Sequence, residues 1–144
     1  FEYILYIYMW SEHIITFITS LFVIAAIDIP VLSQIMYPMW KKMIPTIQNH
    51  PMVVNKLYAL VAYLLLALAI SIFSIPNIRS TEIIRDSIFY GGSLGIIIYG
   101  IFDFTNLAIF KKYKLKVGII DTLWGGLLLS VASYIVKLIL IQIK

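Results

Sequence analysis

The sequence predicts an all-α integral membrane protein, a four-helix bundle whose antiparallel helices are joined by up-down connections. Of its 144 residues, 62% are hydrophobic and only 12% are charged, whereas about a quarter of the residues in soluble domains are charged. Four stretches are long and apolar enough to cross a bilayer, which takes about 20 residues, and most charged residues fall between them. The composition therefore argues against a soluble fold, and its high hydrophobicity excludes a disordered chain.

The four expected spans belong to a single domain of residues 1–144. Pro45 and Pro51 lie in the first connection, and Pro76 ends the second span because proline removes a helical hydrogen bond. We expect the spans at residues 14–40, 57–75, 87–110 and 117–141.

The first span is preceded by an aromatic-rich segment, residues 1–13. One helix from Tyr3 to Trp40 would be ~55 Å long, which is too long for a single bilayer crossing. We therefore expect residues 1–13 to lie in the membrane interface or against a neighbour. Within the span, Pro30 predicts a kink.

The lysines and arginines are distributed unevenly between the two ends of the expected bundle. The connections after the first and third spans carry seven of them, and the opposite side carries four: Arg79, Arg85, Lys137 and Lys144. The positive-inside rule then places both lysine-bearing connections in the cytoplasm and both termini on the other side. Which membrane the protein occupies stays open.

Three carboxylates lie within apolar spans: Asp28, Asp103 and Asp121. Each costs about 2.5–3.5 kcal/mol at the centre of a spanning helix, so such residues normally face a bundle interior or a water-filled cavity. Counted from the ends of their spans, all three fall in the half of the bundle nearest the lysine-bearing connections. We expect them to lie close together.

Neighbouring residues extend this polar region. Tyr99, Asp103 and Asn106 are spaced i, i+4, i+7 and so share one helix face. Asp121 and Trp124 share a face of the fourth span, which a short connection makes the antiparallel neighbour of the third. Two interpretations stay open for the acids. They are either hydrogen-bonded fasteners, with Asp121 at a helix N-terminus, or a site for a proton, an ion or a solute.

Small and basic residues suggest further roles. Glycines allow close helix packing, here within the chain or in a homodimer, and we single out Gly91, Gly95, Gly100, Gly125 and Gly126. The basic connection sets the topology or contacts anionic lipids through Lys111, Lys112, Lys114 and Lys116.

Catalytic and metal-binding motifs are not found in the sequence. It has no cysteine and two histidines without a partner at ligand spacing, so we expect no metal. No Ser-His-Asp set, glycine-rich phosphate loop or HExxH motif occurs. We expect no enzyme activity, no cofactor and no nucleic-acid partner, since topology explains the net charge of +4.

Two motifs flank the lysine-rich connection. The third span contains YGIFDFTNLA at residues 99–108, and the fourth begins with DTLWG at residues 121–125. Together they resemble the domain-of-unknown-function family 2177, small predicted membrane proteins mostly from bacteria. Members carry Tyr-Gly-x-x-Asp-x-Thr-Asn-x-Ala and Asp-x-x-Trp-Gly at similar spacing. The likeness is weaker in the first span, where Val31 replaces a usual Trp, which suggests a divergent, viral or organellar member.

The resemblance implies four spans and one polar core, and it brings no assigned activity. The core that we expect comprises Asp28, Tyr99, Asp103, Thr105, Asn106, Asp121 and Trp124. Small size favours a structural or assembly subunit of a membrane complex, surrounded by lipids and by other subunits or further copies. The alternative is a carrier or channel-like protein for small solutes, coupled to protons or cations through the intramembrane acids.

Overall fold

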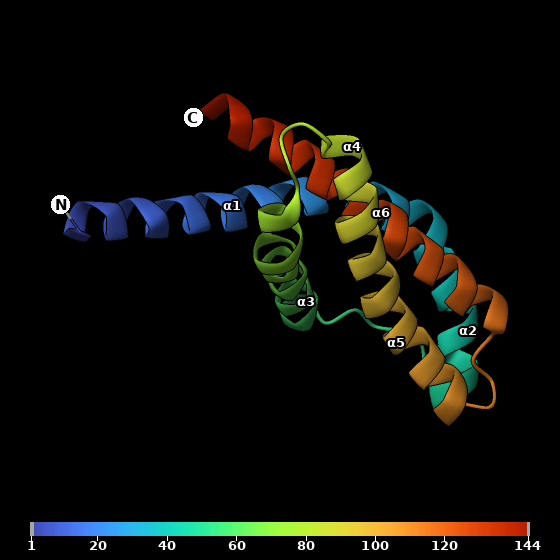
Figure 1. The fold of residues 1–144 in the computed structure, drawn as a ribbon. Coiled ribbons are helices and arrows are strands. Elements are labelled where there is room, and N and C mark those ends of the chain that lie inside the picture. The colour runs from blue at the N-terminus through green and yellow to red at the C-terminus, as the bar shows by residue number, and fades with distance from the viewer. Residues whose placement is uncertain (1, 144) are drawn as a thin grey trace.

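The computed structural model describes the backbone of residues 2–143 and the side chains of residues 12–143. Residues 2–143 contain helices and connections but no strand. Four helical stretches are long and apolar enough to cross a membrane, at residues 12–48, 56–77, 83–109 and 115–143. The predicted all-α, four-span fold is therefore confirmed. Figure 1 shows its antiparallel arrangement.

Each span but the fourth is built from several helical segments. The first combines α1 (Glu2–Val31), η1 (Leu32–Met36) and α2 (Tyr37–Gln48); the second combines α3 (Lys56–Ala69), η2 (Ile70–Ser74) and η3 (Ile75–Asn77). The third combines α4 (Ile83–Asp86), η4 (Ser87–Gly92) and α5 (Ser93–Ile109), and the fourth is α6 (Leu115–Ile143). Here η1, η2 and η4 are π-helical and η3 is a 3₁₀ turn.

The bundle has two distinct ends. The connections 49–55 and 110–114 border one common cavity, and we call this the lysine end. The two termini lie at the opposite end (Figure 1), together with the connection 78–82. There Arg79 donates through Nε and Nη2 to the buried carboxylate of Asp86, both at 2.8 Å, which ties the connection to α4.

The first span bends without ending at its proline. Pro30 lies inside α1, and the π-helical η1 follows it directly. A proline lacks the N–H that a helix needs, and π-helical turns commonly absorb such local disruptions. The chain changes direction between α1 and α2 (Figure 1). The expected interfacial placement of residues 1–13 stays a prediction, because side chains 1–11 and all of residue 1 lie outside the described part.

Helices α5 and α6 pack along a line of glycines. A Cβ atom at Gly95 would overlap the backbone carbonyl of Gly125, and one at Gly91 would lie 2.5 Å from the carbonyl oxygen of Leu129. At Gly126 it would press on Ile96, at 2.7 Å from Cγ1. These glycines are therefore used for packing within the chain. Gly100 has room by comparison, with Thr122 Cγ2 at 3.4 Å as its nearest neighbour.

A layer of fully buried aliphatic side chains crosses the middle of the bundle, and we call it the aliphatic layer. It comprises Ile24 of α1, Ala67 of α3 and Leu128, Leu129 and Ala132 of α6. Along each of the three spans that contain these residues, polar side chains stand about one helical turn to either side of the layer. The layer thus separates two polar regions of the interior.

Candidate functional site

The first carboxylate of the interior, Asp28, joins three helices. Its side chain is 6% exposed. Oδ2 accepts a hydrogen bond from the Tyr63 hydroxyl of α3 at 2.6 Å, and Oδ1 accepts one from the indole Nε1 of Trp124 in α6 at 2.8 Å. The desolvated acid is thus matched by two donors from other helices, as buried polar groups require.

The second carboxylate, Asp103, is fully buried in α5. Its Oδ1 accepts from the hydroxyl of Tyr113, in the connection 110–114, at 2.7 Å. Its Oδ2 accepts from the Thr122 hydroxyl of α6 at 3.2 Å. Gly118 of α6 makes room for this pairing, because a Cβ there would lie 3.3 Å from the Asp103 Cβ. Asp103 therefore fixes the turn between the third and fourth spans.

The third carboxylate, Asp121, differs from the other two. It is 2% exposed, yet it makes no hydrogen bond to any of the residues 12–143 whose side chains are described. Its charge is close enough to interact with those of Asp103 and Asp28. Helix α6 begins at Leu115, so Asp121 lies beyond the first turn, where an N-terminus no longer favours an acid strongly. The helix-capping interpretation is therefore not supported.

Tyr99 lies at the centre of the carboxylate cluster, a name that we give to Asp28, Asp103 and Asp121. Its ring lies against the backbone of Gly125, where a Cβ atom would overlap it. It is also within electrostatic reach of all three acids. The glycine that allows close helix packing thus also admits the tyrosine.

Asn106 and Thr105, both expected in the polar core, differ in their placement. Asn106 is half-buried and lines a cavity of about 550 Å³ at the lysine end, together with Tyr113. The Tyr113 hydroxyl on Asp103 connects this cavity to the carboxylate cluster. Thr105 is exposed, because its position on α5 points away from the cluster. The expectation that Thr105 belongs to the polar core is thus not met by its placement.

Of the four donors to the acids, Trp124 was expected from the sequence and the other three were missed. Tyr63 stands in an aliphatic stretch, Tyr113 in a lysine-rich connection, and Thr122 next to Asp121. A phenol inside an otherwise aliphatic span was the available signal for Tyr63. For Tyr113 the sequence offers no such signal. The lysines expected to contact anionic lipids, Lys111, Lys112, Lys114 and Lys116, are all exposed around it.

A second polar region lies beyond the aliphatic layer, and we call it the serine cluster: Ser20, Ser71, Ser74 and Ser133. Ser74 and Ser133 share a hydrogen bond of 2.8 Å between α6 and the second span. The Ser71 hydroxyl donates to the carbonyl of Ala67 at 2.7 Å and lies 3.4 Å from Ser20 Oγ. No motif or spacing in the sequence singles out these residues.

The chemistry open to the carboxylate cluster is limited by its geometry. Among the described residues, no group of three or more His, Cys, Asp or Glu side chains is arranged to hold a metal ion. Asp28 and Asp103 direct their oxygens at O–H and N–H donors instead. The arrangement can fasten helices and can hold protons.

Four apolar spanning helices around buried, hydrogen-bonded acids define a small multi-pass integral membrane protein. A family model described as "Predicted membrane protein (DUF2177)" matches residues 13–138, and the chain therefore belongs to this family. The resemblance seen in the motifs of the third and fourth spans is thereby confirmed. No curated protein and no solved structure matches the chain.

Proposed function

We propose that this protein is a structural or assembly subunit of a membrane or membrane-bound complex, and that its carboxylate cluster fastens the helices. The observation that carries the proposal is the pair of hydrogen bonds on Asp28, which joins α1 to both α3 and α6. Asp103 supports it in the same way at the turn between α5 and α6. Interhelical hydrogen bonds in membranes contribute about 0.6 kcal/mol each on average.

The exposed apolar side chains and the lysines indicate what surrounds the subunit in the membrane. Large apolar side chains are exposed along all four spans, for example Phe22 at 70% and Leu65 at 60%, and we assign them to contacts with lipids, other membrane subunits or further copies. The positive-inside rule favours a cytoplasmic lysine end. The exposed lysines there suit the anionic lipids of that leaflet.

A carrier coupled to protons is the second candidate, and Asp121 favours it. This buried acid lies near two others and makes no hydrogen bond among the residues whose side chains are described. A proton held between neighbouring acids would relieve the repulsion of like charges. A cation receives less support, since no metal-holding group is found among the described residues.

One set of variants separates the two candidates. Asp28→Asn, Asp103→Asn and Asp121→Asn are purified, melted in detergent, and reconstituted into liposomes that contain a pH-sensitive dye. Glu82→Gln, an exposed acid at the opposite end, is the matched control. A fastening role predicts lower melting temperatures for Asp28→Asn and Asp103→Asn, and no proton flux above that of protein-free liposomes for the unaltered protein. Flux that Asp121→Asn abolishes without loss of folding would favour the carrier.

A further inference from the structure

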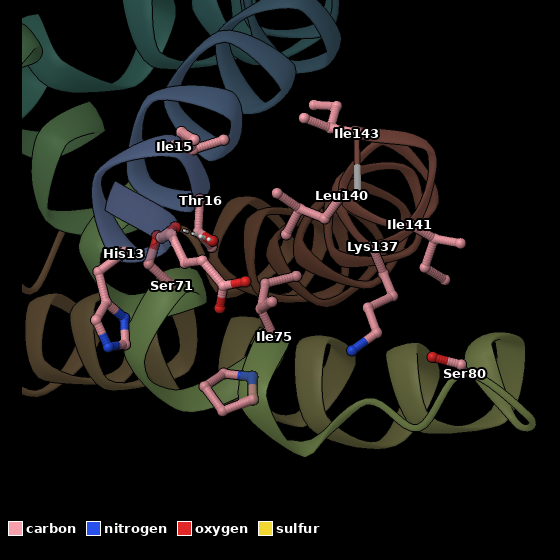
Figure 2. A pocket seen from close by; sticks show the side chains of 12 residues that line it. His13, Ile15, Thr16, Ser71, Ile75, Ser80, Lys137, Leu140, Ile141 and Ile143 are labelled. Atoms are coloured by element: carbon pink, nitrogen blue, oxygen red, sulfur yellow. Dashed lines mark hydrogen bonds between the residues drawn. The ribbon is translucent and has the colours of Figure 1, made fainter. Parts of the chain in front are cut away.

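A cavity opens at the end of the bundle opposite the lysines. Its volume is about 570 Å³, within the range of small-molecule sites. Four segments line it: α1, the η2–η3 turn, the connection 78–82 and the last turns of α6. Figure 2 shows His13 and Lys137 on opposite sides of the cavity, with Ile75 between them. The cavity lies beyond the aliphatic layer and so is separate from the carboxylate cluster.

Ionisable groups of both signs line this cavity. Glu12 and His13 come from α1, and Lys137 comes from α6, six residues before its end at Ile143. An ionisable residue inside a spanning helix normally faces a polar cavity and marks a functional site. The wall thus offers an ammonium group on one helix and a carboxylate on another.

Two nearly buried hydroxyl groups line the same cavity. Thr16 and Ser71 are 8% and 6% exposed, and their hydroxyls donate to the backbone carbonyls of Glu12 and Ala67, both at 2.7 Å. A hydroxyl has one proton to donate and two lone pairs. Because the proton is directed at a carbonyl, each oxygen presents an acceptor to a ligand. The side of the cavity formed by α1 and η2 is therefore suited to a ligand N–H group.

The rim of the cavity is apolar. Ile15 of α1 and Leu140, Ile141 and Ile143 of α6 line it beside the polar groups. A ligand bound here meets both polar and aliphatic surface, as in most small-molecule sites.

We propose that this cavity binds a zwitterion that carries a primary ammonium group and an anionic oxygen group. The ammonium contacts Glu12 and the hydroxyl oxygens of Thr16 and Ser71, and the anionic group contacts Lys137. The ethanolamine phosphate headgroup of a phospholipid and a free amino acid share this chemistry. The inference does not depend on the proposed function, because the aliphatic layer separates the two sites.

Binding is measured on the full-length protein in detergent, by calorimetric titration and by the shift in melting temperature. The probes are dihexanoyl phosphatidylethanolamine, dihexanoyl phosphatidylcholine, phosphoethanolamine and glycine. We expect saturable binding of the probes that carry a primary ammonium, and at least about tenfold weaker binding of phosphatidylcholine, whose quaternary nitrogen has no N–H to donate. Binding of the ethanolamine lipid alone assigns a lipid ligand, whereas binding of glycine or phosphoethanolamine assigns a soluble one.

Variants connect the binding to the cavity. Lys137→Gln and Glu12→Gln are expected to weaken binding at least about tenfold, as the loss of one charge-assisted contact predicts. Arg85→Gln and Glu82→Gln, both exposed and outside the cavity, are the matched controls and should bind as the unaltered protein does. Equal binding of both lipids, binding of no probe, or binding unaffected by Lys137→Gln would overturn the proposal. If a charge variant does not fold, Thr16→Val and Ser71→Ala decide, since unchanged binding in both contradicts it.

Discussion

The two polar regions of the interior are built from different side chains, and only one of them borders a cavity of about 570 Å³. In the half near the lysine end, large donors reach across to the acids: Tyr63 and Trp124 to Asp28, and Tyr113 to Asp103. In the other half, small hydroxyls meet each other or their own helix, and a cavity of about 570 Å³ stays open. The same four helices thus form one half that is fastened by hydrogen bonds and one half with room for a ligand.

The size of the side chains accounts for this difference. A tyrosine or tryptophan spans the gap between two helices and carries its donor at the tip. A serine hydroxyl reaches only a neighbouring backbone or another close hydroxyl, as Ser71 does with Ala67. Helices joined by serines must therefore approach closely, and elsewhere they leave space. The comparison predicts that substitutions in the two halves have different consequences.

The largest expected effect is a loss of stability of the whole bundle, because it disturbs the packing of α5 on α6. In Gly95→Ala the new Cβ would overlap the carbonyl of Gly125, and backbone atoms cannot move aside as a flexible side chain can. We expect the free energy of unfolding to fall by about 3 kcal/mol or more, measured by equilibrium unfolding in mixed detergent micelles. Gly100→Ala, where the nearest atom is at an ordinary 3.4 Å, is the control. A Gly95→Ala protein as stable as this control would refute the packing of α5 on α6.

The next largest loss of stability is expected in the half near the lysine end, where hydrogen bonds to Asp28 join three helices. Asp28→Ala leaves the Tyr63 hydroxyl and the Trp124 indole N–H without their acceptor in a buried region. An unsatisfied buried donor costs about 1–3 kcal/mol, so we expect a loss of this order in the same unfolding assay. The indole should also change its fluorescence, since it loses its hydrogen-bond acceptor. Unaltered stability would show that these hydrogen bonds do not fasten the bundle.

A smaller effect is expected in the half with the cavity. Ser133→Ala removes the 2.8 Å contact with Ser74, and membrane hydrogen bonds average about 0.6 kcal/mol. The double-mutant cycle with Ser74→Ala should give a coupling energy of about this size. A coupling above about 1.7 kcal/mol, the largest value measured for a hydrogen bond in a membrane protein, would contradict the weak contact that we expect in this half.

The smallest effect on stability is expected at Asp121. Asp121 makes no hydrogen bond among the side chains described, so Asp121→Asn breaks no such contact and reduces the repulsion from Asp28 and Asp103. We expect a melting temperature equal to or above that of the unaltered protein. A clear fall would show that Asp121 fastens helices as the other two acids do.

Sequence patterns predicted the spans and the acids because both depend on composition along one helix. A carboxylate in an apolar stretch is costly wherever the helix points, so Asp28, Asp103 and Asp121 stood out. The i, i+4, i+7 spacing placed Tyr99 and Asn106 on the face of Asp103 in the same way. Thr105 shared the motif but not the face, and its side chain is exposed.

Contacts between helices could not be predicted in this way. Tyr63 and Tyr113 find their acids only once the rotation of α3 and the path of the connection 110–114 are known. The serine cluster gave no signal, because serines in spanning helices commonly bond to their own backbone, as Ser71 does. The cavity depends on where α1, η2–η3 and α6 lie relative to each other, which no single helix encodes.

The hydrogen bond between Asp28 and Tyr63 provides the most direct test of the fastening role. A double-mutant cycle of Asp28→Ala and Tyr63→Phe, measured by equilibrium unfolding, isolates the energy of this one contact. A fastening role predicts a favourable coupling of about 0.6–1.7 kcal/mol, the range from the average to the largest value measured for hydrogen bonds in a membrane protein. A coupling of zero, with Asp28→Ala as stable as the unaltered protein, would contradict it.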